Sequence, residues 1–528
     1  MTKDFIAEGL RGGWRVHDAS RLEKDLVLEA DVAVIGTGAG GGISAEVLAQ
    51  AGFKLVLIEE GPLKSSKDFN LSEADAYSDL YQECAGRKTK DKAINILQGR
   101  CVGGGTTVNW TSSFATPEPT LRHWTRDHGV KGFSAAEMKP WFDRVWERLN
   151  IIPWQVPPNA NNDSIRRGAE KLNWSYGVMN RNIKNCANLG YCGMGCPINA
   201  KQSMLVTTIP SALQAGAQLV TRARAERFTL KNGRIDALTC RAMNDRGTFP
   251  SGVTVRVRAK YFVCAAGAIG TPALLLRSAV PDPYELVGKR TFLHPVNAVS
   301  GMMKEPTNPF YGAPQSLYSD QFLWPEGDSM GYKIEVAPLH PLLTSTVIEG
   351  HGENHHHFMQ RLPHLQTMIA LCRDGFHPGS QGGRVSLKAD QTPVLDYPIS
   401  AYLWEAMRRS YLSMAELQFA SGAERVMPHH RAVTQPFSSW KATKKAIAEL
   451  DMKPLLVRIF SAHVMGGCPM GEDPRQAVVD STGRFFHLEN LSIIDGSIFP
   501  TSIGSNPQVS IYGASLKNVT ILAERLKG

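Results

Sequence analysis

Two polar side chains near the C-terminal end of the chain have the right types for acid–base chemistry. His463 lies in the segment SAHVMGGCPMG, and Asn506 precedes Pro507 in SIGSNPQ. The unperturbed pKa of an imidazole, about 6.5, lies near working pH, so histidine suits the transfer of a hydroxyl proton. A carboxamide can donate or accept a hydrogen bond at the same hydroxyl group. The pair is therefore a candidate for chemistry on an alcohol.

Both residues also have an ordinary structural explanation. The chain has 15 histidines, and any one of them is more often a hydrogen-bonded core residue than a base. Asn506 followed by Pro507 is also a good helix start, with asparagine as N-cap and proline at the first helical position. The asparagine side chain would then fold back onto its own helix. On these residues alone, capping is the better interpretation of Asn506.

A glycine-rich turn between a strand and a helix predicts a dinucleotide site. The apolar run DVAVI precedes the turn, a helix of small and apolar residues follows it, and the next strand ends at Glu59. Gly36 permits the tight turn, Gly38 lets the backbone approach a pyrophosphate, and Gly41 lets the helix pack on the strand. The helix N-terminus attracts phosphate, and Glu59 can accept hydrogen bonds from a ribose. The turn does not distinguish FAD from NAD, and a turn without a ligand is the alternative.

A second glycine cluster lies in GRCVGGGTTVNW. Gly103 and Gly104 allow the backbone to approach a flat ligand closely, and they are followed by Thr106 and by Asn109, which adds a polar contact. Without other support, a surface turn would be the better interpretation of this segment.

Four segments, in this order, resemble the glucose-methanol-choline (GMC) oxidoreductases. VIGTGAGGG with LVLIEEG is similar to the family's FAD-binding start, and GRCVGGGTTVNW to its first signature. GAIGTPALLLRSA is similar to the second signature, although Ala279-Val280 replaces an aliphatic–glycine pair at its end. SAHVMGGCPMG with DGSIFPTSIGSNPQ is similar to the catalytic C-terminus. The match runs from about residue 30 to 525, and four ordered motifs are far more specific than one.

The resemblance implies FAD as the cofactor and an α/β fold (α+β overall), with a Rossmann-like FAD-binding domain and a second, sheet-containing substrate domain. We expect the FAD-binding domain to comprise residues 1–120, 205–297 and 456–528. The substrate domain and active-site cover would comprise residues 121–204 and 298–455, where the β-α rhythm is lost. The expected FAD contacts are Gly36, Gly38, Gly41, Glu59, Gly103, Gly104, Thr106, Asn109, Ala225, Asp495, Gly496 and Pro507.

The resemblance also assigns catalytic roles. His463 becomes the base for the hydroxyl proton, and Asn506 fixes the orientation of the hydroxyl group. The helix after Asn506 would aim its positive end at the flavin pyrimidine ring. Glu335, in GYKIEV, is a further candidate for positioning the substrate. We expect His294 to be structural, and the run His355–His357 to be a solvated loop.

Three cysteines lie close together in CANLGYCGMGCP: Cys186, Cys192 and Cys196. A tetrahedral metal site needs four ligands, commonly including a C-x₂₋₄-C pair, so this spacing predicts no metal. We interpret the segment as a glycine-rich loop with buried free thiols near the substrate entrance. With GWRVHDAS, it resembles the long-chain alcohol oxidase and dehydrogenase branch of the family, whose loop typically carries one more cysteine, where this chain has Leu189.

The composition is that of an ordinary globular protein of 528 residues, 43% apolar and 20% charged. The net charge of +9 is scattered, which argues against nucleic acid as a partner and leaves peripheral association with an anionic membrane face open. No stretch approaches the ~20 apolar residues of a membrane span, and the N-terminal residues lack an apolar signal region. With nine cysteines expected to be reduced, we expect a cytoplasmic protein, free or at the inner membrane face.

The expected reaction is FAD-dependent oxidation of primary, long-chain aliphatic alcohols to aldehydes by hydride transfer to flavin N5. The chain length comes from the branch resemblance and not from composition. An oxidase of sterols or other bulky alcohols, and a non-redox flavin enzyme, are the alternatives on this scaffold; a NAD-dependent dehydrogenase and a basic binding protein are alternatives from other classes. The electron acceptor is a quinone, a cytochrome or oxygen, and the expected cytosolic location favours a dehydrogenase, because peroxide released there would be harmful.

Overall fold

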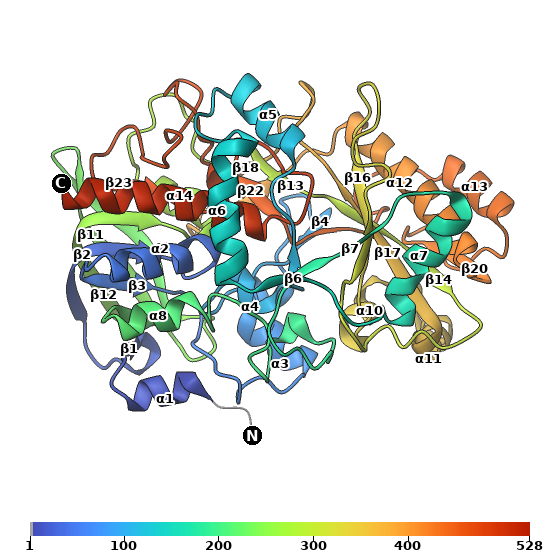
Figure 1. Cartoon of the computed structure of the whole chain (residues 1–528), viewed down its shortest axis with the longest axis horizontal. Helices are drawn as coiled ribbons and strands as arrows, with labels where there is room; N and C mark the ends of the chain where they lie inside the picture. Colours follow the sequence, from blue (N-terminus) through green and yellow to red (C-terminus); the bar gives the residue numbers. More distant parts are fainter. Residues whose placement is uncertain (1–3) are drawn as a thin grey trace.

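Two eight-stranded mixed sheets organise the chain, and the computed structural model describes residues 4–528 of it (Figure 1). The first sheet has the order β1-β9-β3-β2-β12-β11-β10, and β23 pairs with the end of β12. Its strands are β1 (Arg15–Asp18), β2 (Leu26–Ile35), β3 (Leu55–Ile58), β9 (Gln218–Thr221), β10 (Ala223–Lys231), β11 (Arg234–Met243), β12 (Pro250–Cys264) and β23 (Leu491–Ile493).

The strand–turn–helix–strand unit predicted from the first glycine turn is formed by β2, α2 (Ala39–Gln50) and β3. Residues 32–35 of β2 pair in parallel register with residues 55–58 of β3. Both segments are buried, which is why they read as continuous apolar runs in the sequence. α8 (Thr208–Gln214) and α14 (Gln508–Lys527) pack against α2.

The second sheet has the order β4-β21-β14-β17-β16-β15-β7, and β20 pairs with β14. Its strands are β4 (Ile94–Ile96), β7 (Gly177–Val178), β14 (Val296–Met302), β15 (Leu317–Ser319), β16 (Tyr332–Val336), β17 (Leu365–Cys372), β20 (Arg425–Pro428) and β21 (Ile459–Ser461). α12 (Ala401–Ala420) packs on β14 and β17, and α7 (Ala160–Leu172) and α13 (Trp440–Glu449) pack on α12.

Each sheet has its own hydrophobic core. The first core joins apolar side chains of β2, β3 and β12 with those of α14, and the second joins β14, β16 and β17 with α12. Figure 1 shows the two sheets side by side, with α2 and α14 beside the first and α7 and α12 beside the second. The α/β class with two sheet-containing parts is confirmed. The domain limits stay a prediction, and residues 1–3 of the first range lie outside the described residues.

The remaining elements are short or peripheral. They are α1 (Phe5–Arg11), α3 (Glu73–Leu80), α4 (Gly105–Val108), β5 (Ser112–Ser113), α5 (Glu118–Asp127), α6 (Ala135–Arg148), β6 (Ile151–Pro153), β8 (Asn180–Asn182), α9 (Gly267–Arg277), β13 (Thr291–Leu293), α10 (Pro341–Val347), α11 (Gly352–Gln360), β18 (Arg384–Leu387), β19 (Pro393–Asp396) and β22 (Val464–Gly466), with 3₁₀ turns η1 (Ala19–Arg21), η2 (Gln82–Ala85), η3 (Cys192–Met194), η4 (Leu362–His364) and η5 (Gly496–Ile498). Within residues 4–528, no helix has the length and apolar character needed to cross a membrane.

The histidine run differs from its prediction as a loop. His355–His357 lie on α11, a short helix with no buried residue. His356 and His357 are exposed, as expected, whereas His355 is half-buried with its Nε2 3.0 Å from the carbonyl oxygen of Ser345, and the segment is helical.

The two glycine turns meet at distances that side chains would prevent. Between the two turns, a Cβ on Gly104 would lie 2.8 Å from the Cα of Gly38; within the first turn, a Cβ on Gly41 would lie 1.9 Å from the carbonyl oxygen of Gly36. A Cβ on Gly38, by contrast, would find only the Cα of Gly104, at 3.8 Å. The protein therefore leaves space beside Gly38, at the N-terminus of α2, where the helix attracts phosphate.

This difference between neighbouring glycines predicts two different phenotypes. Gly38→Val should fold with nearly normal stability and lose bound FAD, because its side chain occupies only the space left for the pyrophosphate. Gly41→Val should lose folding stability, because its side chain collides with backbone inside the strand–helix contact. Urea denaturation with a measurement of bound flavin checks both variants. Normal FAD binding by Gly38→Val would show that the space beside Gly38 does not hold the cofactor.

Candidate functional site

His463 and His294 face each other because of the register between two short strands. β13 and β22 are antiparallel, with Leu293 opposite Val464, so the next residue on each side brings the two histidines together. The backbone N–H of His294 donates to the carbonyl oxygen of His463 over 3.3 Å. Their ring nitrogens Nδ1 stand 3.0 Å apart. His294 is fully buried, whereas His463 is only partly buried.

The hydrogen bonds of His294 determine which nitrogens carry hydrogen. The backbone N–H of Gly504 donates to Nε2 of His294 over 3.1 Å, so this nitrogen is unprotonated in the arrangement that satisfies Gly504. In a neutral ring the hydrogen then lies on Nδ1 of His294, which donates it to Nδ1 of His463. Among residues 4–528, Nε2 of His463 makes no hydrogen bond, and the side chain as a whole is partly exposed.

The surroundings keep this pair of imidazoles uncharged at neutral pH. Burial lowers the pKa of His463 to about 4. Burial also lowers the pKa of His294 well below its ordinary value, and the nearby His463, Arg373 and Lys333 lower it further. The pair can therefore accept a proton at neutral pH without already holding an extra one.

The side chain of Asn506 points to a carboxylate in the second sheet. Its Nδ2 donates to Oε2 of Glu335 over 3.3 Å, and Nε2 of Gln315 donates to the same oxygen over 2.7 Å. Glu335 lies on β16 and is 1% exposed. Burial raises its pKa, and the positive charge of Lys333 opposes that rise. The Oε1 of Glu335 and the Oδ1 of Asn506 are buried and have no hydrogen-bond partner among the described residues.

The helix-capping interpretation of Asn506 is wrong. The N-cap position of α14 is taken by Pro507, and no side chain caps this helix. Because the amide of Asn506 faces Glu335, its remaining hydrogen-bonding capacity is directed away from its own helix. The loop that carries it is tied to the histidine pair through Gly504, two residues earlier.

Hydrogen bonds from Thr37, in the first glycine turn, and from Gly61 fix the position of the Glu59 carboxylate. Its Oε2 accepts from the N–H and hydroxyl group of Thr37, at 3.2 and 2.6 Å, and its Oε1 accepts from the N–H of Gly61 at 2.9 Å. The hydroxyl oxygen of Thr37 in turn accepts from the N–H of Gly103 at 3.1 Å. Thr37 thus joins the end of β3 to both glycine turns. Burial raises the pKa of Glu59.

The second glycine cluster is connected to the start of α14. Nδ2 of Asn109 donates to Oε1 of Gln508 over 2.7 Å. The hydroxyl group of Thr106 donates to the carbonyl oxygen of Gly103 and accepts from the N–H of Met204, so it shapes the turn from within. What this cluster offers to a flat ligand is mainly backbone.

The carboxylate of Asp495 also accepts hydrogen bonds from groups within the protein. Its Oδ2 accepts from the N–H of Gly267 at 2.8 Å and the hydroxyl group of Thr271 at 2.7 Å, and its Oδ1 accepts from Ser497. The carboxylate therefore fixes the start of α9 next to η5, and a ligand would meet the backbone of Asp495.

The other expected FAD contacts lie on three different elements. Gly496 lies in η5, Pro507 is the N-cap residue of α14, and Ala225 lies half-buried on β10, where its carbonyl oxygen accepts from Arg277. The roles of these residues toward FAD stay predictions.

Several residues of this network were missed by sequence reasoning. His294 was interpreted as structural, and Thr37, Gln315 and Gln508 were not considered. Thr37 could have been found from its place inside the glycine turn. The others depend on contacts between segments far apart in the sequence, and local patterns carry no signal for such contacts.

The cysteine loop differs from its prediction in one respect. Cys186, Cys192 and Cys196 are free thiols, but they are partly exposed rather than buried. Among the described residues, no group of three His, Cys, Asp or Glu side chains is arranged to hold a metal ion.

The arrangement fits FAD. The protein leaves space beside Gly38 at a helix N-terminus, places the acidic Glu59 at the end of the next strand, and brings a second glycine-rich backbone against the first. These are the parts that a dinucleotide requires.

Comparisons with known proteins agree with this site. Residues 77–296 and 378–515 match the two family models described as GMC oxidoreductase. The long-chain-alcohol oxidase FAO4A of Arabidopsis thaliana is 28% identical over 94% of this chain and 69% of its own length. An uncharacterized GMC-type oxidoreductase, y4nJ, of Sinorhizobium fredii is 28% identical over 94% of this chain and 95% of its own.

Solved structures show the same fold. Pyridoxine 4-oxidase from Mesorbium loti superimposes with a TM-score of 0.69 at 16% identity, covering 93% of this chain and 98% of that one. Formate oxidase from Aspergillus oryzae superimposes with a TM-score of 0.70 at 14% identity, covering 96% and 99%. The chain therefore belongs to the GMC oxidoreductase family, a family of FAD-binding enzymes that act on CH–OH donors.

Proposed function

We propose that this enzyme oxidises primary, long-chain aliphatic alcohols to aldehydes, with His463 as the base and Asn506 as the residue that orients the hydroxyl group. The observation that carries the proposal is the histidine pair. His463 has a neutral ring, an Nε2 with no hydrogen-bond partner among the described residues, and a fully buried partner that fixes its orientation. When bound, FAD supplies a hydride acceptor at N5.

Proton transfer to His463 requires an unprotonated Nε2. With hydrogen on Nε2 of His294 and on Nδ1 of His463, the pair stays joined and presents that lone pair to the substrate. In this arrangement the N–H of Gly504 loses its acceptor, which costs roughly 1–3 kcal/mol for a buried donor. A general base contributes about 10²–10⁴-fold in rate, or roughly 3–5 kcal/mol, so the arrangement remains favourable for catalysis.

Asn506 has the capacity to hold the hydroxyl oxygen in place. One N–H of its amide is used by Glu335, which leaves the second N–H and the carbonyl oxygen for the substrate. Glu335 and Gln315 thus act as positioning residues, because they hold the amide without taking part in proton transfer.

The aliphatic chain of the substrate is inferred from relatives. Plant long-chain-alcohol oxidases match nearly the whole chain at 23–28% identity. This supports a long-chain primary alcohol as the first substrate to test, with sterols and other bulky alcohols as the comparison.

Anaerobic flavin spectra with primary alcohols of increasing length test the reaction. We expect bleaching of bound FAD that becomes faster with chain length. Faster bleaching by a sterol would overturn the substrate class, and no bleaching by any alcohol would favour non-redox chemistry.

Replacing His463 tests the base. His463→Ala should keep FAD and slow anaerobic flavin reduction by decanol at least ~10²-fold, the lower limit for losing a general base. His356→Ala, an exposed residue of α11, is the matched control and should react normally. Near-normal reduction in His463→Ala would remove this residue from the mechanism.

The pH dependence of flavin reduction follows from the lowered pKa of His463. The neutral imidazole is the active form, and it predominates above a pKa of about 4. The rate of flavin reduction should therefore rise with pH around pH 4 and stay level from about pH 5.5 to 8, as expected for a base that is already deprotonated. Stopped-flow measurement of flavin reduction after a pH jump gives the rate at each pH. A midpoint near 6.5, the ordinary value for histidine, would contradict it.

Glu335 offers a test of the amide network. In Glu335→Gln, the new carbonyl oxygen can take the place of Oε2, so Asn506 and Gln315 keep their acceptor and stability should change little. In Glu335→Leu the amides of Asn506 and Gln315 both lose this acceptor, which should lower the free energy of unfolding by roughly 1–3 kcal/mol for each amide. Urea unfolding of the two variants makes the comparison, and equal stability would show that the network contributes nothing.

A further inference from the structure

One cross-strand row of the second sheet runs from the carboxylate that holds Asn506 to a buried histidine. Glu335 on β16 stands opposite Ile369 on β17, and Ile369 stands opposite Ala298 on β14. The backbone N–H of His429, directly after β20, donates to the carbonyl oxygen of Ala298 over 3.0 Å and continues the row by one strand. Residues directly opposite each other in a sheet share one face, so the four side chains of the row lie on the same side.

The row is polar at its two ends and apolar between them. Neighbouring strands lie about 4.8 Å apart, so three spacings separate Glu335 from His429 by about 14 Å. Ile369 and Ala298 occupy the interval and belong to a small cluster of buried apolar side chains. The other buried members of this cluster are Val296, Ala337 and Leu371. A chain of methylene groups would therefore find apolar contacts along the row and a polar group at each end.

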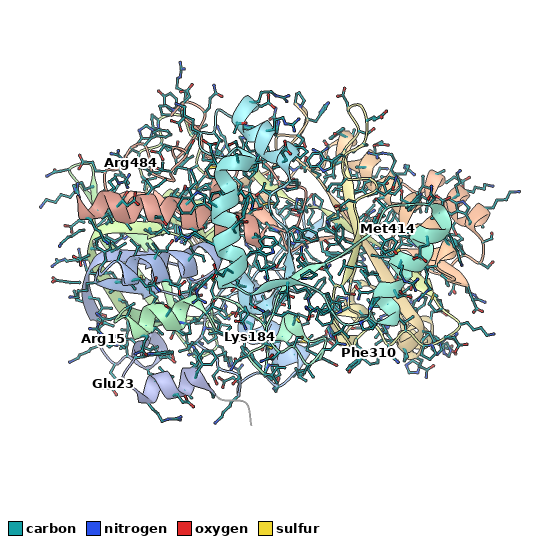
Figure 2. The ribbon with its side chains drawn as sticks, viewed as in Figure 1. Arg15, Glu23, Lys184, Phe310, Met414 and Arg484 are labelled. Atoms are coloured by element: carbon teal, nitrogen blue, oxygen red, sulfur yellow. The ribbon has the colours of Figure 1, made fainter. Side chains whose placement is uncertain are left out.

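This face of the sheet is packed less tightly than the face behind it. Behind it, toward α12, Val299, Met368 and Ala370 are 0% exposed, and Met414 of α12 belongs to the same core (Figure 2). In front, the buried residues of the apolar cluster keep between 2 and 9% of their surface. Trp110, the last residue of the second glycine cluster, packs against them. The row therefore faces the side of the molecule where FAD is expected, and room remains in front of it.

His429 forms a polar end with one ring nitrogen unused. Its Nε2 lies 2.7 Å from Oγ of Ser300, and that oxygen lies 2.7 Å from Oγ1 of Thr367. His429 is 4% exposed, and among residues 4–528 its Nδ1 makes no hydrogen bond. Buried polar atoms nearly always have a hydrogen-bond partner, so this nitrogen indicates a partner that is not part of the protein.

The chemistry at His429 suits a hydroxyl group better than a carboxylate. Burial lowers the pKa of His429 to about 4, so its ring is uncharged at neutral pH. The nearby charges of Glu349 and Arg458 are paired with each other. A neutral imidazole has one N–H and one lone pair, and the bond to Ser300 decides which of them Nδ1 presents. A hydroxyl group can donate or accept, so it fits both arrangements.

We propose that this row binds a long-chain diol with a hydroxyl group at each end. Asn506 orients the hydroxyl group that is oxidised, and Nδ1 of His429 binds the second one. Ile369 and Ala298 contact the methylene chain between them. The separation of about 14 Å corresponds to an extended chain of about ten carbon atoms. This inference rests on the proposed alcohol oxidation and adds to it the chemistry at the far end of the substrate.

Alcohols and diols of equal length test this subsite in the unaltered holoenzyme. The measurement is the concentration that half-saturates the rate of anaerobic flavin reduction, for chains of about six to fourteen carbons. One hydrogen bond contributes roughly 2–10-fold in affinity, and the two equivalent ends of a diol add about twofold. We therefore expect decanediol to half-saturate at a concentration at least ~4-fold below that of decanol. This advantage should be largest near ten carbons, because only that length reaches both ends of the row.

The outcomes of this series separate the subsite from the reaction. Without a polar partner, a diol would bury its second hydroxyl group unpaired, and decanol would bind more tightly. Equal or tighter binding of decanol would thus overturn the subsite and leave the alcohol oxidation standing. Tighter binding of the hydroxy acid of the same length would overturn the choice of an uncharged group. Flavin that neither alcohols nor diols reduce would reject the proposed oxidation itself.

Replacing His429 locates the second hydroxyl group. His429→Phe keeps a ring and removes both nitrogen atoms, so the ratio of the half-saturating concentration of decanediol to that of decanol should rise at least ~4-fold. Because both substrates are measured on the same variant, a general loss of stability cancels from the ratio. His356→Phe, the same substitution at an exposed residue of α11, is the matched control and should keep the parent ratio. A parent-like ratio in His429→Phe would overturn the assignment.

Narrowing the middle of the row tests the path of the chain. In Ala298→Leu the larger side chain occupies room in front of the sheet, so decanol and decanediol should both half-saturate at concentrations roughly 5-fold higher or more, relative to butanol. Butanol provides the reference because its chain ends before it reaches Ala298. An unchanged ratio of decanol to butanol in Ala298→Leu would show that the chain follows another path, and would overturn the row as its binding surface.

Discussion

The site depends on backbone segments that approach each other more closely than any side chain allows. A Cβ on Gly40 would lie 1.9 Å from the carbonyl oxygen of Ile494, and one on Gly36 would lie 2.2 Å from that of Ala265. Together with the contact between Gly38 and Gly104, these approaches bring three distant parts of the chain to the N-terminus of α2. A flat, phosphate-bearing cofactor needs such a surface, because backbone N–H groups can bind phosphate only where no side chain intervenes.

The fold could be predicted where local patterns decide it. The strand, turn and helix around Gly36 follow from apolar runs and glycine positions, and α14 begins within one residue of its predicted start. The histidine run on α11 could not be assigned in this way, because an exposed polar segment reads equally as a loop or as a surface helix. The second sheet was predicted only in outline, since its strands pair across long stretches of sequence.

In the candidate site, too, local sequence patterns predict only some of the residues. His463 and Asn506 stand in recognisable motifs, but their partners do not. His294 reaches His463 through the register of β13 and β22, and Glu335 reaches Asn506 across 171 positions of sequence. Nothing in the segment LHP or GYKIEV indicates either contact. Sequence patterns therefore identify the residues that act on substrate better than the residues that hold them, because positioning depends on tertiary contacts.

Charge is distributed differently in the two polar regions of the molecule. Burial keeps both His294 and His463 neutral, and the cations Arg373 and Lys333 lower the pKa of His294 further, so a proton taken from a substrate is held weakly and can be released. Lys333 also has Asp320 and Glu335 to balance its charge. Within the part of the chain that the structure describes, Arg181 and Lys201 form no ion pair with a carboxylate, although they are as deeply buried. Lys201 is held instead by three backbone carbonyl oxygens, and the guanidinium of Arg181 lies over the ring of Trp154, so carbonyl dipoles and an aromatic face stabilise these cations where carboxylates do not.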